Sequence, residues 1–334
     1  MAYTPVPTGQ TTQTSSLAHL QTILYKKKTL DRLQTKFVFR QICMDDSLPK
    51  MSGKTVQWFR YTNLTANTTP KSPEGAVGTS TYITSKTVSC TVSQYTNFIT
   101  VSDLLRDTAI DPVLDNASEL LGYQAGLSVD TITRNVIDNE SSSTAQSLLG
   151  SYLRAADFRN GRHQLQGINV LPYEDGNFCG IVHPYVSFDL VNDPQSLGLG
   201  DIFKYTAPES ARLLKYEDRG TISVVGGVKV IESTNVYKIS GSPNKWRAYI
   251  FGYRGVGAVD LEGRGPNQVS DPAKQRFAIQ VIRPKGGELY DPEGVIGGAC
   301  SYNFVFAVVV LEGPAGIGGK YRYVTIDCPS SIVS

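Results

Sequence analysis

The sequence has 334 residues, of which 40% are hydrophobic and 19% are charged, and its formal net charge is +2. This length and hydrophobic share suffice for one large or two ordinary domains, and they exclude a disordered chain. The longest apolar run, Phe304 to Leu311, has eight residues, well short of the ~20 that a membrane-spanning helix needs, so we expect no transmembrane helix and no membrane partner.

The first part of the chain is expected to be an arm followed by a helix. Residues 1 to 16 are rich in Thr, Ser, Pro and Gln, which is typical of a flexible segment. Apolar residues at near-helical spacing then predict a helix between 17 and 40. These residues are Leu17, Leu20, Leu24, Leu30, Leu33 and Phe37. Lys26, Lys27 and Lys28 give this helix a cationic face.

The next segment predicts a long β-hairpin. Thr55 to Tyr61 has a strand-like pattern, 63 to 80 is rich in Asn, Thr, Pro and Gly, and Thr81 to Ser102 is rich in Thr and β-branched residues. Two arms of about 20 residues would reach roughly 60 Å. Because such a hairpin cannot bury itself, we expect it either to be disordered or to lie on another chain.

A long helix is predicted from 111 to 137. Asp111 can cap the first N–H groups and Pro112 suits the first turn. The apolar stripe that follows persists for about 27 residues, which corresponds to roughly 40 Å. This length is unusual for a globular domain and suits a girder that spans it. The Ser-rich stretch at 140 to 151 is a plausible domain boundary.

The remainder alternates short units and indicates the α+β class with a large share of strands. Helices are expected at 184 to 192 and 208 to 215. A hairpin is expected at 221 to 232, where Gly226 and Gly227 suit a tight turn. Further strands are expected at 178 to 183, 246 to 252, 277 to 282, 301 to 312 and 321 to 328.

No motif indicates a cofactor or a metal. The five cysteines are never closer than 28 residues and the three histidines lack ligand spacing, so we expect reduced thiols and no zinc site. Gly53-Lys54-Thr55 lacks the upstream glycine of a phosphate-binding loop. In the stretch 255 to 260, Asp260 replaces the third glycine of a dinucleotide fingerprint, so we expect a turn between strands there.

Several longer phrases, taken in order, carry a resemblance to a known family. They are VQWFRYTNL at 56 to 64, TTPKSPEG at 68 to 75, SQYTNFITVSDLLRDTAIDPVLDNASELLGYQAG from 93 to 126, GIVHPYVSFDLVND at 180 to 193, and DPEGVIGGACSYNFVFAVVVLEG at 291 to 313. Together they span most of residues 20 to 312. The sequence resembles the major capsid proteins of tailed bacteriophages, and more narrowly the coat-protein family of the N-four-type podophages.

The resemblance implies the Hong Kong 97-type capsid fold and a division of the chain. Under that division, 1–51 is an N-terminal arm and helix, and 52–100 is an extended β-hairpin loop. A peripheral domain comprises 101–150 and 286–334 and contains a long spine helix at 111–137. An axial domain comprises 151–285. The predicted hairpin and the predicted girder thus correspond to the extended loop and the spine.

The resemblance also implies a function without catalysis. Such a chain self-assembles into pentamers and hexamers of an icosahedral shell that encloses double-stranded DNA without sequence specificity. It is made in the host cytoplasm and resides in the virion. Since no long charged helical segment precedes residue 17, we expect a separate scaffolding protein, together with a portal and, in some virions, a decoration protein.

The charge distribution suggests which residues make the contacts between subunits. Residues 1 to 98 hold 11 Lys or Arg and 4 Asp or Glu, a net +7, and residues 99 to 334 hold 21 and 26, a net −5. A cationic arm and loop can therefore lie on anionic neighbouring subunits. The expected contact residues are Lys26, Lys27, Lys28, Arg32, Lys54, Arg60, Lys71, Glu74 and Lys86.

Two alternatives stay open at this point. One is another structural component of the virion, such as a tail or connector protein. The other is a cytosolic enzyme whose site is assembled from the dispersed residues Asp260, Glu262 and His183, although no spacing in the sequence unites them.

Overall fold

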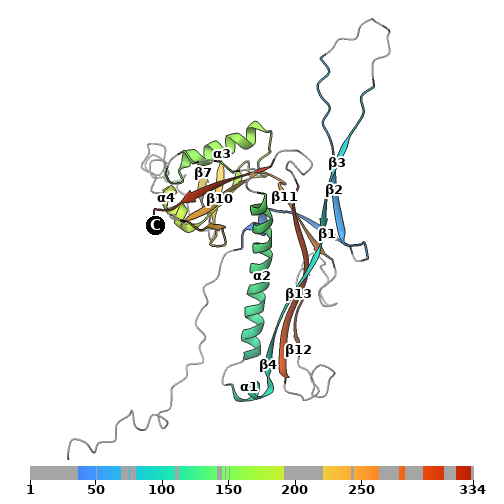
Figure 1. Ribbon diagram of the computed structural model, residues 1–334, viewed down its shortest axis with the longest axis vertical. Coiled ribbons are helices and arrows are strands. Elements are labelled where there is room, and N and C mark those ends of the chain that lie inside the picture. Colours follow the sequence, from blue (N-terminus) through green and yellow to red (C-terminus); the bar gives the residue numbers. More distant parts are fainter. Residues whose placement is uncertain are drawn as a thin grey trace, which may run out of the picture.

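The molecule has two lobes and a projecting hairpin (Figure 1). The computed structural model describes residues 37–49, 51–68, 75, 80–109, 113–140, 145–146, 148–149, 151–191, 221–241, 244–262, 278–282, 296–311 and 321–331. The expected arm, most of the expected helix between 17 and 40, and the expected helix at 208 to 215 lie outside these residues.

One lobe, called the α2 lobe here, combines a long helix with a sheet that has five strands among the residues the structure describes. The sheet has the order β1-β11-β13-β12, with β4 on the other side of β13. Only β1 and β11 run parallel, and the other pairs are antiparallel. The elements are β1 (Met44–Leu48), β4 (Ser93–Ser102), α1 (Asp103–Thr108), α2 (Val113–Asn139), β11 (Val256–Leu261), β12 (Ala278–Ile282) and β13 (Ile296–Val310).

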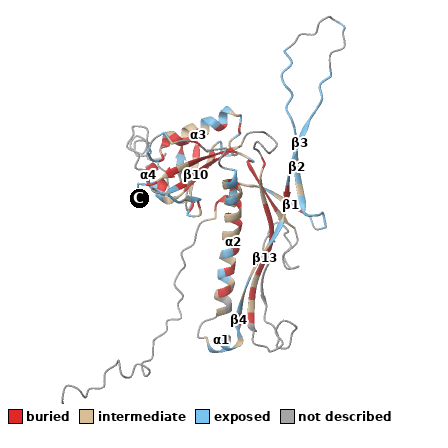
Figure 2. Ribbon diagram, viewed as in Figure 1, coloured by how far each residue is buried: buried red, intermediate tan, exposed pale blue. Residues whose placement is uncertain are grey.

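The helix α2 packs on this sheet through one apolar stripe. Four buried residues at i, i+4 spacing form the stripe, as the helical period requires. They are Ala117, Leu121, Ala125 and Val129, which belong to one cluster with Tyr302, Phe304 and Phe306 of β13. The predicted helix at 111 to 137 is thus confirmed as a 27-residue helix over Val113–Asn139. Figure 2 shows its buried face turned toward β13.

The second lobe, the β10 lobe, surrounds a larger sheet. Among the described residues this sheet has seven strands in the order β5-β14-β10-β6-β8-β7, and β9 pairs with β10. Its elements are β5 (Ala145–Gln146), α3 (Ala155–Gly167), β6 (Phe178–Val182), α4 (Pro184–Val191), β7 (Thr221–Val225), β8 (Val228–Glu232), β9 (Lys238–Ile239), β10 (Lys245–Phe251) and β14 (Tyr323–Pro329). The predicted strand–helix unit at 178 to 192 and the hairpin at 221 to 232 are confirmed, and both turn glycines have positive φ.

The sheets do not follow the division of the chain that we expected at residue 285. β14 lies in the β10 lobe, because it pairs with β10 over all seven of its residues. β11 and β12 lie in the α2 lobe, because both pair with β13. The chain therefore crosses between the lobes after β10 and again after β13. The stretch around 255 to 260, expected as a turn, forms the strand β11.

The hairpin comprises β2 (Thr55–Tyr61), β3 (Ser85–Thr91) and the residues between them. It projects from the upper end of the α2 lobe, beside β1 (Figure 1). The expected arms of about 20 residues are shorter in the structure, because only seven residues of each arm pair. The second half of the predicted strand run from Thr81 to Ser102 forms β4, which leaves the hairpin and pairs with β13.

The expected helix between 17 and 40 does not continue to residue 40. Phe37 and Val38 are not helical, and Phe39–Ile42 form a single 3-10 turn, η2. The cause is a competing acceptor, because the backbone N–H of Phe39 donates to the carboxylate of Asp130 at 2.8 Å.

Candidate functional site

The root of the hairpin is anchored to the α2 lobe by one of its faces. Val56 and Trp58 of β2 lie directly opposite Cys90 and Val88 of β3. Val88 and Cys90 are buried. Val56, Trp58 and Cys90 pack in a cluster with three residues of the α2 lobe, which are Leu48, Val259 and Ala307. The root is therefore part of the folded core, and it sets the direction in which the rest of the hairpin projects.

Beyond the root the hairpin exposes large apolar side chains. Tyr82 is 84% exposed, Ile83 71%, Phe59 66%, Tyr61 62% and Leu64 59%. Figure 2 shows the projecting part as an exposed segment. Isolated exposed apolar residues are common on protein surfaces, but a group of five on one projecting element marks an interaction surface.

Three of the expected contact residues lie on or beside the hairpin, and all three are exposed. They are Lys54, Arg60 and Lys86. Arg60 lies directly opposite Lys86 in the strand register, and like charges in that position disfavour the pairing of the two strands. An acidic surface would offset this repulsion. The other expected contact residues, which are Lys26, Lys27, Lys28, Arg32, Lys71 and Glu74, lie outside the described residues.

The base of the hairpin is held by ionic and hydrogen-bonding contacts that the sequence did not predict. Arg40 pairs with Asp45 and, at 2.8 Å, with Asp260 of β11. Burial by itself would lower the pKa of Arg40, but the two carboxylates outweigh it and the pKa is raised. The hydroxyl of Ser47 donates to Glu262 at 2.6 Å. Together these contacts fix β1, which precedes the hairpin, against the five-stranded sheet.

A buried carboxylate joins the two lobes at the middle of α2. Asp130 accepts hydrogen bonds from the backbone N–H of Phe39 and from the side-chain amide of Asn235, each at 2.8 Å. Arg134, one turn further along α2, donates to the backbone carbonyl of Asn235 at 3.1 Å. Burial raises the pKa of Asp130, and the hydrogen bonds oppose that rise.

A second carboxylate, two turns further along α2, makes a similar joint. Asp138 accepts a hydrogen bond from the hydroxyl of Tyr249 at 2.5 Å and lies 3.6 Å from the guanidinium of Arg247. Arg247 also pairs with Asp327 at 2.7 Å. Burial raises the pKa of Asp138. The interface between the lobes thus combines these polar contacts with the buried apolar side chains of Phe39 and Ile137, and the polar contacts constrain the relative orientation of the lobes.

The residues of the alternative enzyme site are not brought together. Asp260 and Glu262 bind partners in the α2 lobe, whereas His183 follows β6 in the β10 lobe. His183 stacks on Trp246 with ring centroids 5.2 Å apart. Its Nδ1 accepts a hydrogen bond from the backbone N–H of Tyr185 at the start of α4. Burial, aided by the charge of Lys238, lowers the pKa of His183 to about 4. These contacts are typical of a histidine that supports the packing of the fold.

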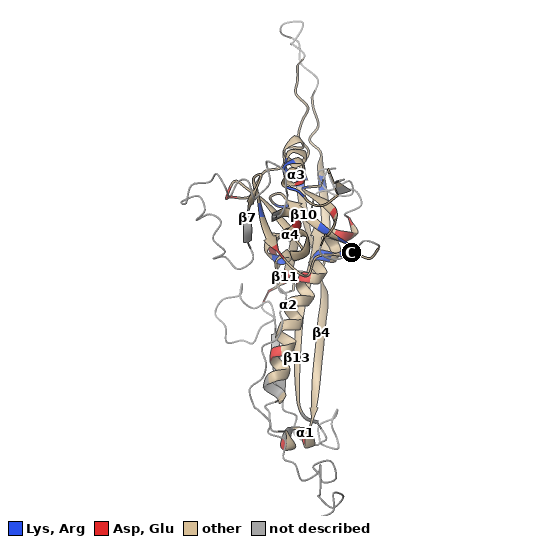
Figure 3. Ribbon diagram, turned by 90° about the vertical axis from the view of Figure 1, so that its left-hand side faces the viewer, with Lys and Arg blue, Asp and Glu red and all other residues tan. Residues whose placement is uncertain are grey.

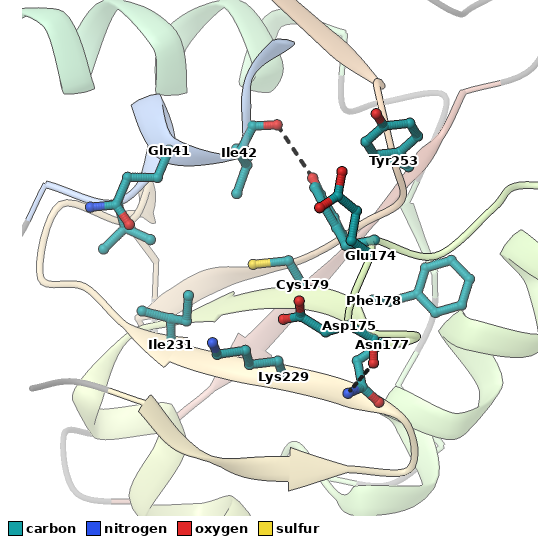
Figure 4. Close-up of a pocket in the computed structure, with 12 residues that line it drawn as sticks. Gln41, Ile42, Glu174, Asp175, Asn177, Phe178, Cys179, Lys229, Ile231 and Tyr253 are labelled. Carbon is teal, nitrogen blue, oxygen red and sulfur yellow. Dashed lines mark hydrogen bonds between the residues drawn. The ribbon is translucent and has the colours of Figure 1, made fainter. Parts of the chain in front are cut away.

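A cavity of about 350 Å³ lies between η2 and the strands β6 and β8. The hydroxyl of Tyr173 donates to the carbonyl of Ile42 across one side of it, at 3.3 Å, and Figure 4 draws this bond as the dashed line that ends on Ile42. Cys179 faces the cavity, but burial raises the pKa of its thiol to about 11, so it carries no thiolate nucleophile at neutral pH.

In the described part of the chain, no group of three His, Cys, Asp or Glu side chains is placed to hold a metal ion. No helix in that part combines the length and the apolar character needed to cross a membrane.

The fold is shared with chains of phage capsids. No protein-family model and no curated protein sequence matches the chain. Solved structures do match: the capsid of Ralstonia phage GP4 has a TM-score of 0.67 at 11% identity, covering 99% of both chains. The head structure of Helicobacter pylori bacteriophage KHP40 has a TM-score of 0.67 at 10% identity, covering 98% of this chain and 99% of that one.

A third match has the same character. The cyanophage Pam1 capsid asymmetric unit has a TM-score of 0.65 at 13% identity, covering 94% of this chain and 97% of that one. Because the likeness extends over nearly the whole length of each chain, it concerns the complete fold rather than one lobe. The chain has the α+β fold of the chains that form phage capsids and heads.

Proposed function

We propose that the chain is the major capsid protein of a tailed bacteriophage. It assembles into the pentamers and hexamers of an icosahedral shell, and it has the Hong Kong 97-type form of the fold. The observation that carries this proposal is the projecting hairpin. The chain has the fold of capsid chains. Its hairpin has a root that packs in the core and five large apolar side chains that are exposed.

In this account each subunit uses its hairpin to bind a neighbour. The hairpin is the extended loop, α2 is the spine helix, and the β10 lobe corresponds to the axial domain. The exposed aromatic residues provide apolar area, and Lys54, Arg60 and Lys86 provide positive charge for an anionic neighbour. Such a contact joins two different surfaces, and contacts of this kind build rings and shells when their rotation closes.

The remaining expectations follow from the same function. The shell encloses double-stranded DNA without sequence specificity and contains a portal. A separate scaffolding protein guides assembly in the host cytoplasm, and a decoration protein can bind outside. The subunit has no catalytic role, and its relatives are the coat proteins of the N-four-type podophages. The neighbours in the structural comparison are described as capsids and heads, which favours the shell over a tail component.

Removal of the hairpin tip tests the proposal. A variant lacking residues 63–80 keeps the buried root and should fold as the wild type does, as judged by circular dichroism and thermal unfolding. Electron microscopy should find no closed shells of this variant. A matched control replaces the same residues by a Gly/Ser linker of equal length, and it should fail in the same way. Normal shells from the deletion variant would contradict the proposal.

A further inference from the structure

The turn between β1 and β2 presents one fully exposed apolar side chain. Met51 is 105% exposed, more than any other large apolar residue in the described part of the chain. Its φ is +65°, in the left-handed region that residues other than glycine rarely adopt. Backbone strain of this kind clusters at binding sites and ligand clamps. The turn therefore holds an unbranched, adaptable side chain away from the rest of the fold.

The cavity between η2 and the strands β6 and β8 offers an apolar space of suitable size. Its volume is about 350 Å³, near the lower limit for small-ligand pockets, so it has room for a single large side chain. In its wall Ile42 and Phe178 are buried and Ile231 is partly buried. Glu174 and Asp175 are exposed and mark its open side. Figure 4 shows these two carboxylates on one side of the cavity and Ile231 on the other.

The charges beside the two features are complementary. Lys54, three residues after Met51, is exposed. The residues that line the cavity include two carboxylates, of Glu174 and Asp175, and one ammonium group, of Lys229. Figure 3 shows basic and acidic positions interspersed over the β10 lobe. An electrostatic match with a neighbour therefore depends on particular pairs rather than on a patch of one sign.

Met51 and the cavity do not meet within one chain. The strand β1 lies between Ile42 and Met51 in the sequence, and its five extended residues span roughly 15 Å. Figure 1 shows the turn after β1 on the side of the molecule away from the β10 lobe. The full exposure of Met51 agrees with this separation. A Met51 side chain that fills the cavity must therefore come from another copy of the chain.

We propose that Met51 of one subunit inserts into the cavity of a neighbouring subunit and brings Lys54 beside Glu174 and Asp175. The insertion buries an apolar side chain that the free subunit exposes, and the fixed turn lowers the entropy lost on binding. The contact joins two different surfaces, so it runs head to tail and closes into rings. It is separate from the contact of the exposed hairpin residues, and it rests on the proposed function only in requiring that copies assemble.

Photocrosslinking tests the contact in the full-length chain. The protein is made with a diazirine analogue in place of its three methionines, and half of the sample is labelled with heavy nitrogen. After irradiation at the highest attainable concentration, mass spectrometry should find residue 51 joined to the peptides that contain Asp175 or Ile231. Light peptides should be joined to heavy ones, which identifies a contact between copies.

Met51→Leu keeps the label at Met1 and Met44 and is the matched control, which should lose these crosslinks. Crosslinks from residue 51 that are absent, that miss the cavity, or that form only within one chain would overturn the proposal, whether or not particles form. Cavity crosslinks without any capsomers or shells would support this contact and count against the proposed function alone.

A reversal of charge gives a second test, with assembly followed by light scattering. Glu174→Lys with Asp175→Lys changes two exposed positions and should leave the fold intact. It should raise the concentration needed for assembly by at least about threefold, because Lys54 then faces like charges. Adding Lys54→Glu should restore assembly, whereas adding Lys86→Glu, at another exposed lysine, should not. No rescue, or equal rescue by both, would contradict the placement of Lys54 at this cavity.

Discussion

Asp130 is a fully buried carboxylate whose hydrogen-bond partners come from two parts of the chain that are distant from α2. It lies on α2, its backbone donor Phe39 is 91 residues away, and its amide donor Asn235 is 105 residues away in the β10 lobe. A buried acceptor with two hydrogen bonds of 2.8 Å is a strong constraint, since its removal takes the acceptor from the Phe39 N–H and leaves the Asn235 amide only its 3.3 Å hydrogen bond to Thr131. Asp130 therefore fixes the N-terminal segment and both lobes together.

Asp130→Ala should lower the free energy of unfolding by about 1–3 kcal/mol, the cost of leaving buried hydrogen-bonding groups unpaired. Chemical denaturation of the soluble chain measures this change. Asp175→Ala, at an exposed position of the loop before β6, is the matched control and should change stability little. A loss no larger than that of the control would mean that Asp130 does not join the lobes.

His183 should make stability depend on pH between about 6.5 and about 4. The folded chain binds this proton less readily than the unfolded chain, because burial lowers the pKa of His183 from 6.5 to about 4. Its contribution is therefore complete above pH 6.5 and is lost as the pH falls toward 4. His183→Asn keeps an acceptor for the Tyr185 N–H but does not titrate. Melting curves of the two proteins should converge on acidification, and a constant difference would refute this assignment.

Most contacts between individual side chains could not be predicted from the sequence. Arg40 and Asp260 are 220 residues apart, and the residues around each of them do not indicate that the two side chains pair. The placement of Lys54, Arg60 and Lys86 on the hairpin followed from the strand pattern around them. The sequence did not single out the exposed Tyr82 and Ile83, because alternation and β-propensity look alike in a buried strand and in one that awaits a partner chain.

At the scale of elements, the apolar repeat of the sequence predicted the elements whose ends that repeat determines. The helix α2 was predicted within two residues of its ends, because its stripe repeats over 27 residues. The partner of β4 was not predicted. A run of β-branched residues indicates a strand, but it does not say whether the strand returns along the hairpin or joins β13, since cross-strand packing decides this.

The two faces of the hairpin should respond differently to substitution. Val88→Ala removes buried methyl groups at the root and should lower the free energy of unfolding by about 1–3 kcal/mol. Phe59→Ser changes an exposed residue and should leave unfolding unchanged, yet it should reduce shell formation. Denaturation and light scattering measure the two effects separately. Loss of stability from Phe59→Ser, or unchanged assembly, would show that this face does not serve a neighbour.

At the scale of the whole molecule, the small net charge of +2 conceals an excess of +7 before residue 99 and of −5 after it. One contact between these halves is made within the chain, by Arg40 and Asp260. Lys54 and Lys86 of the hairpin region are exposed and can face a second subunit. Exposed pairs contribute only ~0–1 kcal/mol each, but they repeat at every subunit of a shell.

Shell stability should consequently fall as ionic strength rises. At 1 M salt the screening length is about 3 Å, against about 10 Å at 0.1 M, so pairs at the surface lose most of their attraction. Thermal disassembly followed by light scattering at several salt concentrations would measure this. A Lys54→Gln, Lys86→Gln variant should show a smaller salt dependence. A shell whose disassembly temperature does not change with salt would argue against charge pairing between subunits.

The central claim is that this chain builds a closed shell, and cryo-electron microscopy of the purified full-length protein at increasing concentration tests it most directly. We expect five-fold and six-fold capsomers or closed icosahedral particles, in which each hairpin lies on an adjacent subunit. A protein that stays monomeric at every concentration, or that assembles with its hairpins free of any neighbour, would contradict the account.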